Sequence, residues 1–567
     1  MDCGSCGTRP DRPHTFLAHA PDVCPSCTTP VEARVVLRDG KAVHLIRCKQ
    51  CGHSERVIAE DGVAWRAAFV ASGRPEDPVP HRFKQTTSTC ATCLALVPTD
   101  VMVAEGKVYF EKVCAACGPS RALVSEDASH YVRAYAFAAA GTQPFQYTKK
   151  AEKGCPTDCG LCDEHEQHTC LPIVEITDHC NLECPVCIVN NQYSTHMSPE
   201  AFRRIVDGLV AREGQLESIA LSGGEPTSHP KLLELLDIAE RPEIARVVLI
   251  TNGVRLGKDR GLAAELRRRG TYIGLQMDGF DAATHKALRG RDLGKEKEAA
   301  LAVIRELDLP TQMIAVIARG VNDDQVGRLI DLFEATDAII SLNFQPASYS
   351  GFGGGTMVHD PLDRVTISGV IQRAEQQTHG RLRRSDFYPL PCSHPQCVSL
   401  TYLLKLDDGR CVPFPRFVNF EKHLNLLRSS AVLPSTRDVE DSLQDTMYEV
   451  FARQDEIPDG PAILAALKRT LTAMFPGRAL TWKEASRIGE RQAKTIFLHH
   501  YMDRHDFDLE RLRKCCHHYP QEDGRVMPAC GFNLFHRGTA KGPDTPKAVW
   551  ARPDSSSGPA GKPEGER

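Results

Sequence analysis

The chain has 567 residues, of which 41% are hydrophobic and 25% are charged, and its net charge at pH 7 is −4. This length predicts three or more structural units, and the composition is that of an ordinary globular protein. No run of basic residues suggests a nucleic-acid partner, so we expect none. The start, MDCGSCGTRP, lacks a secretory pattern, and no apolar run approaches the ~20 residues of a membrane helix. We therefore expect a cytoplasmic enzyme.

Cysteine is the outlier, with 23 residues. A reducing cytosol disfavours a disulfide framework, so closely spaced cysteines are better explained as metal ligands.

The first 135 residues contain an internal repeat of two CxxC pairs separated by a hairpin-like sequence. Each repeat can bring four thiolates to one tetrahedral centre, and either zinc or iron suits such a site. We predict a zinc-ribbon-like unit over 1–71 and a second ribbon over 85–135, with 72–84 as a linker. The ligands are Cys24, Cys27, Cys48 and Cys51 in the first ribbon and Cys90, Cys93, Cys114 and Cys117 in the second. Cys3 and Cys6 form a further pair whose role the sequence leaves open.

Alternating strand and helix patterns extend from residue 171 to about 385, which predicts an α/β unit with a parallel sheet. The sheet is either a partly closed barrel or doubly wound, and in both cases ligands bind at the carboxyl ends of the strands. Candidate strands cover 171–177, 217–223, 245–253, 271–279, 311–320 and 338–346.

Three cysteines follow the first of these strands, at the spacing CxxxCxxC: Cys180, Cys184 and Cys187. Three thiolates can hold three irons of a [4Fe–4S] cluster and leave the fourth iron open, as a chemically active cluster requires.

Polar and glycine-rich segments follow the next three strands. The second strand ends in Gly223, Gly224, Glu225 and Pro226, where glycines allow close backbone approach and the carboxylate suits an ammonium group. The third and fourth strands end near Asn252 and near Gln276 and Asp278, and Arg289 in the following helix is a weaker candidate for binding a carboxylate.

The CxxxCxxC and GGEP segments together resemble the radical S-adenosylmethionine (SAM) superfamily. The resemblance implies a partial (β/α)6 TIM-like radical SAM barrel whose cluster cleaves SAM to a 5′-deoxyadenosyl radical, which then abstracts hydrogen from a C–H bond. It also implies that SAM lies against the polar residues at the ends of strands two to four.

Two further cysteine groups flank the barrel. Four cysteines in the segment 150–170 predict an auxiliary [4Fe–4S] cluster, with a zinc site using His165 or His168 as the alternative; they are Cys155, Cys159, Cys162 and Cys170. The region 386–537 supplies candidates for a second auxiliary cluster, of which Cys515 or Cys516 is expected to be spare and Cys411 is a ligand or a core thiol. These are Cys392, Cys397, Cys411, Cys515, Cys516 and Cys530. Residues 538–567 are expected to be disordered.

The composite cysteine pattern over 85–535 resembles the superfamily branch that contains archaeal tetraether synthase, whose members were once named dihydropterin methyltransferases. The resemblance implies about three [4Fe–4S] clusters, a rubredoxin-like second ribbon, and C–C coupling between lipid alkyl chains. Radical C-methylation of a pterin or another small molecule is the alternative, and a non-catalytic electron carrier is disfavoured. The first ribbon departs from this branch.

The expected partners are a lipid or small-molecule substrate and an electron donor such as ferredoxin or flavodoxin. A lipid substrate adds peripheral membrane contact and predicts an apolar channel that reaches the space between Cys187, Gln276 and the C-terminal cysteines.

Overall fold

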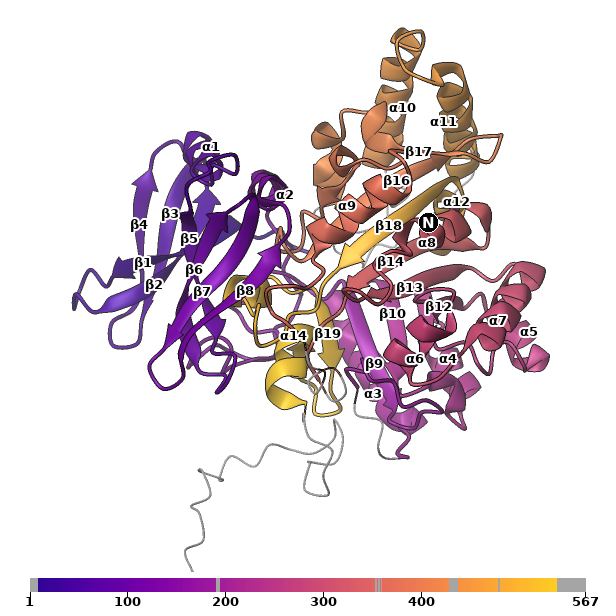
Figure 1. Cartoon of the computed structure of the whole chain (residues 1–567), viewed down its shortest axis with the longest axis horizontal. Coiled ribbons are helices and arrows are strands. Elements are labelled where there is room, and N and C mark those ends of the chain that lie inside the picture. Colours follow the sequence, from indigo (N-terminus) through magenta and orange to yellow (C-terminus); the bar gives the residue numbers. More distant parts are fainter. Residues whose placement is uncertain are drawn as a thin grey trace, which may run out of the picture.

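The computed structural model describes residues 9–189, 194–351, 354, 357, 359–427, 437–477 and 480–537. Cys3, Cys6 and the predicted disordered tail lie outside these ranges. Two antiparallel sheets lie beside a large α/β unit, from which a helical lobe projects (Figure 1). Within the described ranges, no helix has both the length and the apolar character needed to cross a bilayer.

The two small sheets repeat one architecture. Each has four antiparallel strands in sequence order: β1 Thr15–Val23, β2 Pro30–Arg38, β3 Lys41–Cys48 and β4 Gly52–Ala59, then β5 His81–Thr89, β6 Leu96–Ala104, β7 Lys107–Cys114 and β8 Gly118–Ser125. The hairpin tips repeat as well, because Asp39–Gly40 and Glu105–Gly106 all have positive φ, as a two-residue type I′ turn requires. The predicted internal repeat is therefore a structural repeat.

Short helices follow each small sheet, namely α1 Gly62–Ala71, α2 Ala128–Ala134 and the 3-10 turn η1 Tyr135–Phe137. The predicted linker 72–84 is shorter than expected, because β5 already begins at His81. The side chains of His81 and Phe83 are buried there, and this burial draws the end of the linker into the sheet.

Six parallel strands form the centre of the large sheet and match the six predicted ones. They are β9 Leu171–Thr177, β10 Leu216–Gly223, β11 Ile244–Thr251, β12 Tyr272–Gln276, β13 Thr311–Ile317 and β14 Ile339–Pro346. The expected α/β unit with a parallel sheet, preceded by two small N-terminal sheets, is confirmed in this architecture.

Two strands from the C-terminal region extend the barrel at both edges, which the sequence pattern did not predict. β18 Ala493–His499 pairs in parallel with β14, and β19 His517–Pro520 pairs in parallel with β9. The two edges approach each other where the rings of His499 and His517 lie 4.4 Å apart. The barrel thus comprises six core strands and two added ones that face each other across the seam.

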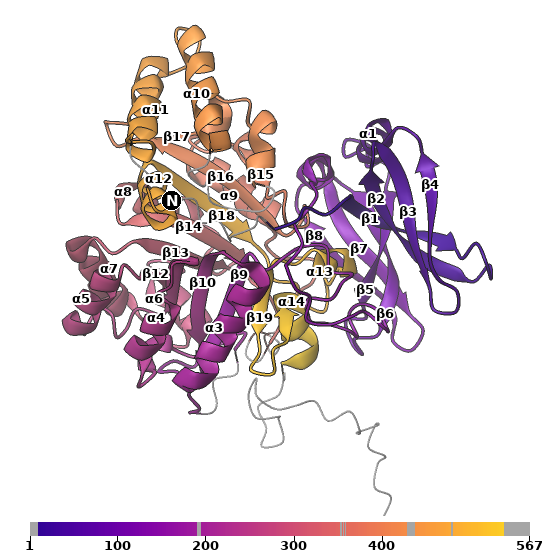
Figure 2. The same cartoon turned by 180° about the vertical axis from the view of Figure 1, so that it is seen from behind.

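Helices cover the outer face of the barrel strands (Figure 2). They are α3 Pro199–Glu213, α4 Leu232–Ala239, α5 Arg260–Arg269, α6 Ala282–Arg289, α7 Gly294–Leu307, α8 Val326–Ala335 and α9 Ile367–Gln377, with the 3-10 turn η2 Pro226–Ser228 after β10. Their apolar faces meet the strands in one core that includes Leu209, Leu235, Leu266, Ile304 and Phe333. Amphipathic helices on a parallel sheet produce this arrangement.

The C-terminal region packs on one edge of the barrel through β18 and then reaches the other edge through β19. It contains the short turn η4 Arg384–Asp386, strands β15 Tyr388–Pro389, β16 Val398–Lys405 and β17 Cys411–Pro413, turns η5 Phe414–Arg416 and η6 Phe420–Leu427, and a lobe of α10 Arg437–Ala452, α11 Gly460–Met474 and α12 Trp482–Gln492. After β18 follow α13 Leu509–Arg513, β19, β20 Val526–Pro528, α14 Ala529–Gly531 and the π-helical turn η7 Phe532–His536.

A buried ion pair joins the second ribbon to this C-terminal region. Lys84 on β5 contacts Glu510 on α13, and the two side chains are 4% and 0% exposed. Glu510 also accepts a hydrogen bond from the backbone N–H of His19 at 2.6 Å, so one carboxylate connects both small sheets to the large unit.

Removing the cation of this pair is expected to destabilise the protein. Lys84→Met leaves the Glu510 carboxylate buried without its counter-ion, a change that typically costs about 3–5 kcal/mol. Arg38→Met breaks the exposed pair with Glu55 and should cost under about 1 kcal/mol. Urea unfolding of the metal-loaded variants measures both, and equally small losses would show that the Lys84 pair does not hold the units together.

Candidate active site

The three cysteines after β9 line one cavity at the carboxyl ends of the barrel strands. The cavity has a volume of about 240 Å³, and its wall includes Cys180, Cys184 and Cys187 together with Gly223 and Gly224. The loop that carries these three cysteines, called the cluster loop below, is held by the segment that follows β14. The N–H of Gly354 in that segment donates to the carbonyl of Cys187 at 3.0 Å.

These thiols sit in a poorly solvated place. Burial raises the pKa of Cys180 to about 12 and that of Cys187 to about 11, and the charge of Cys184 adds to both shifts. Thiolates gathered here therefore need a compensating cation, and a metal cluster supplies one because metal binding displaces the protons. The donor set fits a [4Fe–4S] cluster.

The glycines after β10 are required by the approach of the cluster loop. A Cβ atom on Gly223 would lie 2.1 Å from the carbonyl oxygen of Thr177, and one on Gly224 would lie 2.3 Å from that of His179. The backbone N–H groups of Gly224 and Glu225 donate to these same carbonyls at 2.8 Å. The GGEP segment therefore holds the residues that immediately precede Cys180.

Glu225 lines the cavity, as predicted. Its Oε1 accepts hydrogen bonds from the N–H and the hydroxyl of Thr227 and from the hydroxyl of Thr251 at 2.7 Å, and its Oε2 accepts one from the N–H of Asn252 at 2.8 Å. Glu225 thus also fastens the end of β10 to the end of β11, and Oε2 keeps acceptor capacity toward the cavity.

Asn252 and Gln276 both line the cavity, as predicted for residues at the strand ends. The Asn252 amide donates to Asn181 Oδ1 at 2.7 Å, which connects β11 to the cluster loop. The Gln276 amide donates to Asp278 Oδ1 at 2.8 Å.

Asp278 does not form part of the described cavity wall. It is fully buried and makes a two-pronged ion pair with Arg289, with both N–O distances 2.7 Å. This pair lowers the pKa of Asp278 against the opposing effect of burial, and it neutralises Arg289. Arg289 itself lines the cavity, so the buried Asp278 carboxylate holds the Arg289 side chain in the cavity wall.

Several cavity residues were not predicted. Lys297 on α7 lines the cavity beside the cluster loop, and the C-terminal region supplies His499, Tyr501, His517 and Tyr519 on the far wall. Lys297 had no sequence signal, since its helix pattern is that of an ordinary amphipathic segment. The other four reach the site only through β18 and β19.

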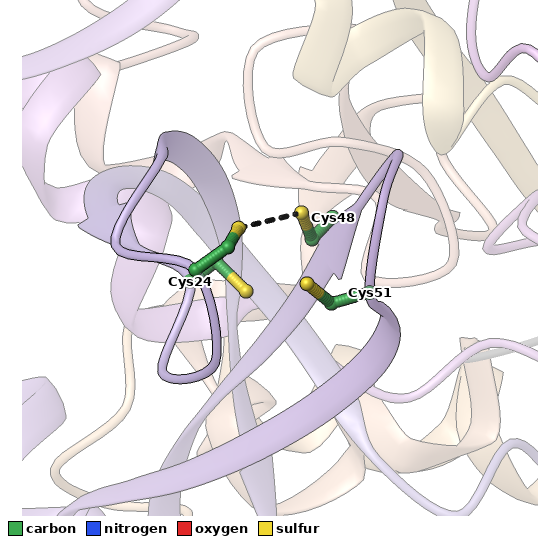
Figure 3. Close-up of side chains that lie close together, drawn as sticks. Cys24, Cys48 and Cys51 are labelled. Carbon is green, nitrogen blue, oxygen red and sulfur yellow. Dashed lines mark hydrogen bonds between the residues drawn. The ribbon is translucent and has the colours of Figure 1, made fainter.

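The ribbon cysteines have the geometry of single-metal sites. In each ribbon the four sulfurs lie within 4.8 Å of one another, and Cys27–Cys48 and Cys93–Cys114 are separated by 3.5 and 3.7 Å. Sulfurs bonded at 2.3 Å to one tetrahedral metal would be about 3.8 Å apart. Figure 3 shows Cys24, Cys48 and Cys51 with their sulfurs turned toward one another.

The structure assigns Cys170 to a different group from the predicted one. Its sulfur lies within 4.8 Å of those of Cys392 and Cys516, so Cys170 is not the fourth member of the 155–162 set. The reason is the pairing of β19 with β9, which places the backbone N–H of Cys170 2.9 Å from the carbonyl of Cys516. Sequence proximity had suggested the other grouping.

The remaining cysteines form two neighbouring sets. Cys155 and Cys159 pack against a cluster that includes Cys530, and burial, with the charges of Cys155 and Cys162, raises the pKa of Cys159 well above its ordinary value. Cys397, Cys515, Cys516 and Cys530 line one small cavity. Cys516 lies between this set and the group that it forms with Cys170 and Cys392.

Cys411 lies apart, on β17, where it packs against the barrel core. This position favours the core-thiol interpretation of Cys411.

Comparison with known proteins agrees with this site. Residues 174–333 match the family model described as the radical SAM superfamily, and residues 82–126 match the HMPTM N-terminal zinc ribbon domain. The barrel and its cysteine loop therefore define a radical SAM enzyme, which uses SAM and a [4Fe–4S] cluster. Residues 174–333 thus form a radical SAM domain.

One relative resembles nearly the whole chain. The 7,8-dihydro-6-hydroxymethylpterin dimethyltransferase of Methanocaldococcus jannaschii is 28% identical over 491 residues, covering 80% of this chain and 94% of the relative. A GTP 3′,8-cyclase of Syntrophomonas wolfei is 32% identical over 181 residues, covering 30% of this chain and 54% of that protein. Among solved structures, Streptococcus suis SuiB bound to precursor peptide SuiA is 17% identical with a TM-score of 0.32, covering 38% of this chain and 46% of SuiB.

A side chain on Gly224 should disrupt the cluster loop. Gly224→Ala places a Cβ against a backbone oxygen that cannot move alone, so we expect 5′-deoxyadenosine formation to fall by about tenfold or more. Gly261→Ala on α5 is the matched control, because its nearest contact would be 3.5 Å and alanine favours a helix. Chromatographic assay of 5′-deoxyadenosine tests both, and equal activities would contradict the proposed role of the close approach.

Replacing Cys180, Cys184 and Cys187 together with Ala should abolish 5′-deoxyadenosine formation. The ribbons and the other cysteine groups use separate ligands, so metal analysis and Mössbauer spectra should still show ribbon metal and auxiliary cluster iron. Undiminished SAM cleavage would refute the assignment of the radical cluster, and loss of all iron would refute the separate sites.

Proposed function

We propose that this enzyme forms C–C bonds between alkyl chains by radical coupling, as in tetraether synthase. The observation that carries the proposal is a mainly apolar cavity of about 220 Å³ that adjoins the radical site.

The two cavities share a wall along the barrel strands and the seam. Ala220, Ile250 and Asn343 line both, and so do His499 and His517. An alkyl chain of the substrate that enters the apolar cavity can therefore extend toward Cys187 and Gln276. This is the path predicted for an apolar channel.

The apolar wall comes from the C-terminal region, with Leu390, Phe414, Leu443, Met474 and Phe497. Each methylene transferred from water into such a cavity contributes about 0.8 kcal/mol. A long alkyl chain could thus bind with few polar contacts.

Polar side chains gather near the amino ends of β11 and β12. Arg246 Nε lies 2.5 Å from Glu490 Oε1, and the Tyr272 hydroxyl donates to Glu490 Oε2 at 2.9 Å. This charge-paired group lies in the wall of the apolar cavity and suits the polar end of an alkyl chain whose other end points toward the cluster loop.

When bound, the cluster and SAM supply a 5′-deoxyadenosyl radical. The residues of the chain hold the substrate carbon in place and exclude water from the barrel lumen. In the net coupling, two C–H bonds become one C–C bond, and both hydrogen atoms leave on 5′-deoxyadenosine. One electron per SAM must come from an external low-potential donor such as ferredoxin or flavodoxin.

Two exposed features support partner contacts for this function. Cys93 and Cys117 of the second ribbon are exposed, which suits an approaching electron donor. Tyr448 and Phe451 are 68% and 61% exposed on α10, the helix whose Leu443 lines the apolar cavity. Such aromatic side chains suit peripheral contact with a membrane that delivers the lipid.

Radical C-methylation of a pterin is the second candidate. It is supported by the name of the Methanocaldococcus jannaschii relative and by polar groups at the junction of the cavities. Gln312 and Asn343 lie there, and Asn343 Oδ1 is buried without a hydrogen-bond partner among the described residues. An N–H group of a heterocycle would satisfy that oxygen.

Anaerobic incubation with SAM and a reductant should distinguish the two. With a saturated diacyl or dialkyl lipid we expect products lacking two hydrogen atoms per new bond, identified by mass spectrometry, and with a dihydropterin we expect no product. Ala220→Phe should narrow the junction and reduce coupling about tenfold, while uncoupled SAM cleavage persists.

Methylated pterin without lipid coupling would overturn the first proposal and support the second. If Ala220→Phe couples lipids at the wild-type rate, the substrate does not pass between the two cavities.

A further inference from the structure

The first ribbon, formed by β1–β4, has a metal site to which the radical SAM chemistry gives no role. The zinc-ribbon family model covers residues 82–126 and therefore matches only the second ribbon. The four sulfurs of the first ribbon lie within 4.8 Å of one another, and Cys48 at the end of β3 is buried. The contacts made beside these metal-binding turns indicate what the first ribbon does.

Arg47 lies on β3 directly before a cysteine ligand of the first ribbon, and it extends to the segment 151–164, called the auxiliary loop below. Its Nη2 donates to the carbonyls of Ala151 at 3.0 Å and of Glu152 at 2.7 Å. Its Nη1 lies 3.0 Å from Glu164 Oε1. One guanidinium therefore contacts both ends of the auxiliary loop.

The auxiliary loop carries three of the auxiliary cysteines between these ends, namely Cys155, Cys159 and Cys162. All of its residues are described, and they form neither a helix nor a strand. Asp158 shapes its interior, because Oδ2 accepts hydrogen bonds from the N–H groups of Glu152 and Gly154, both at 2.8 Å. Its two ends are joined to each other from outside, by Arg47.

The second ribbon provides an internal comparison, because the two small sheets repeat one architecture. Val113 on β7 directly precedes Cys114, as Arg47 on β3 directly precedes Cys48. Val113 is 69% exposed, whereas the Arg47 side chain is 25% exposed. The ribbon fold therefore needs no bound residue at this position, and the role of Arg47 comes from its contacts with the auxiliary loop.

Glu164 links Arg47 to the charge beside the auxiliary cysteines. Its Oε1 pairs with Arg47, and its Oε2 lies 3.2 Å from Arg513 Nη1. Burial raises the pKa of Cys155 to about 12 and also raises that of Cys162, and the charge of Glu164 adds to both shifts. Arg47 thus compensates a negative charge that acts on sulfurs which bind iron as thiolates.

We propose that the first ribbon is a metal-dependent clamp for the auxiliary loop, in which Arg47 is the positioning residue. The ribbon metal fixes the turn between β3 and β4, which begins at Cys48, and thereby fixes Arg47. The guanidinium then holds both ends of the auxiliary loop in the form that binds its cluster. Zinc or iron in the first ribbon therefore supports retention of a cluster at a separate site, whichever substrate the enzyme uses.

The test follows how fast each cysteine becomes accessible. Fully loaded enzyme is exposed anaerobically to an iron chelator and iodoacetamide, and site-resolved mass spectrometry measures alkylation over time. In Arg47→Met we expect the cysteines of the auxiliary loop to be alkylated about tenfold faster than in wild type, as for the loss of hydrogen bonds to a charged group. Cys180, Cys184 and Cys187 should keep their wild-type rates, because they bind a different cluster.

Arg56→Met is the matched control. Arg56 Nη2 pairs with Asp22 Oδ1 at 2.6 Å within the first ribbon, and its side chain is 56% exposed. Its loss leaves the clamp in place and should not change the rates in the auxiliary loop. A Cys27→Ser, Cys51→Ser variant removes two ligands of the ribbon metal and keeps Arg47, so it should show the same selective acceleration as Arg47→Met.

The midpoint potential of the auxiliary clusters, measured by EPR-monitored redox titration, is a second readout. Arg47→Met leaves the charge of Glu164 with one partner instead of two, so the potential of the cluster at the auxiliary loop should become more negative. Equal acceleration at all cysteines would show general destabilisation and overturn the proposal. Wild-type rates and potential in Arg47→Met, or wild-type rates after loss of the ribbon metal, would overturn it as well.

Discussion

The parallel pairing of β19 with β9 is the interaction on which the rest of the site depends. It joins the C-terminal region to the first strand of the barrel, with His517 opposite Leu171. The pairing brings Cys516 next to Cys170 and places His517 in the walls of both the radical-site cavity and the apolar cavity. Backbone hydrogen bonds set this register. One strand pairing therefore positions Cys170 and Cys516, the barrel seam at His517 and the cluster loop that follows β9.

Desolvation of thiols is the second constraint. Burial raises the pKa of Cys155, Cys180 and Cys515 to about 12 in each case. Without metal these thiols remain protonated and do not repel one another, but they become thiolates when metal binds. Metal loading is therefore coupled to the packing of the C-terminal region against the barrel. Cys170, which precedes the first barrel strand, shares one group with Cys392 and Cys516 of the C-terminal region.

The wall of the apolar cavity comes from two parts of the chain. The barrel strands contribute apolar side chains such as Ala220 and Ile250 together with the polar Asn343, whereas the C-terminal region contributes Phe414 and Met474. Strand residues alternate between the lumen and the helix layer, so only every second residue of a barrel strand reaches the lumen. The lobe around α10–α12 and β16 supplies the rest of the apolar wall.

Local patterns in the sequence determined the ribbons, the six core strands, the cluster loop at Cys180–Cys187 and the glycines after β10. Each of these depends on residues close together in the chain, where ligand spacing, hairpin turns and strand periodicity leave few alternatives. The tertiary structure alone decided that Cys170 joins Cys392 and Cys516, that Asp278 is neutralised by Arg289, that Lys297 faces the cavity and that β18 and β19 extend the barrel. These features join segments that are brought together by long-range packing and strand pairing, whose register depends on the whole fold and is not written in any local pattern.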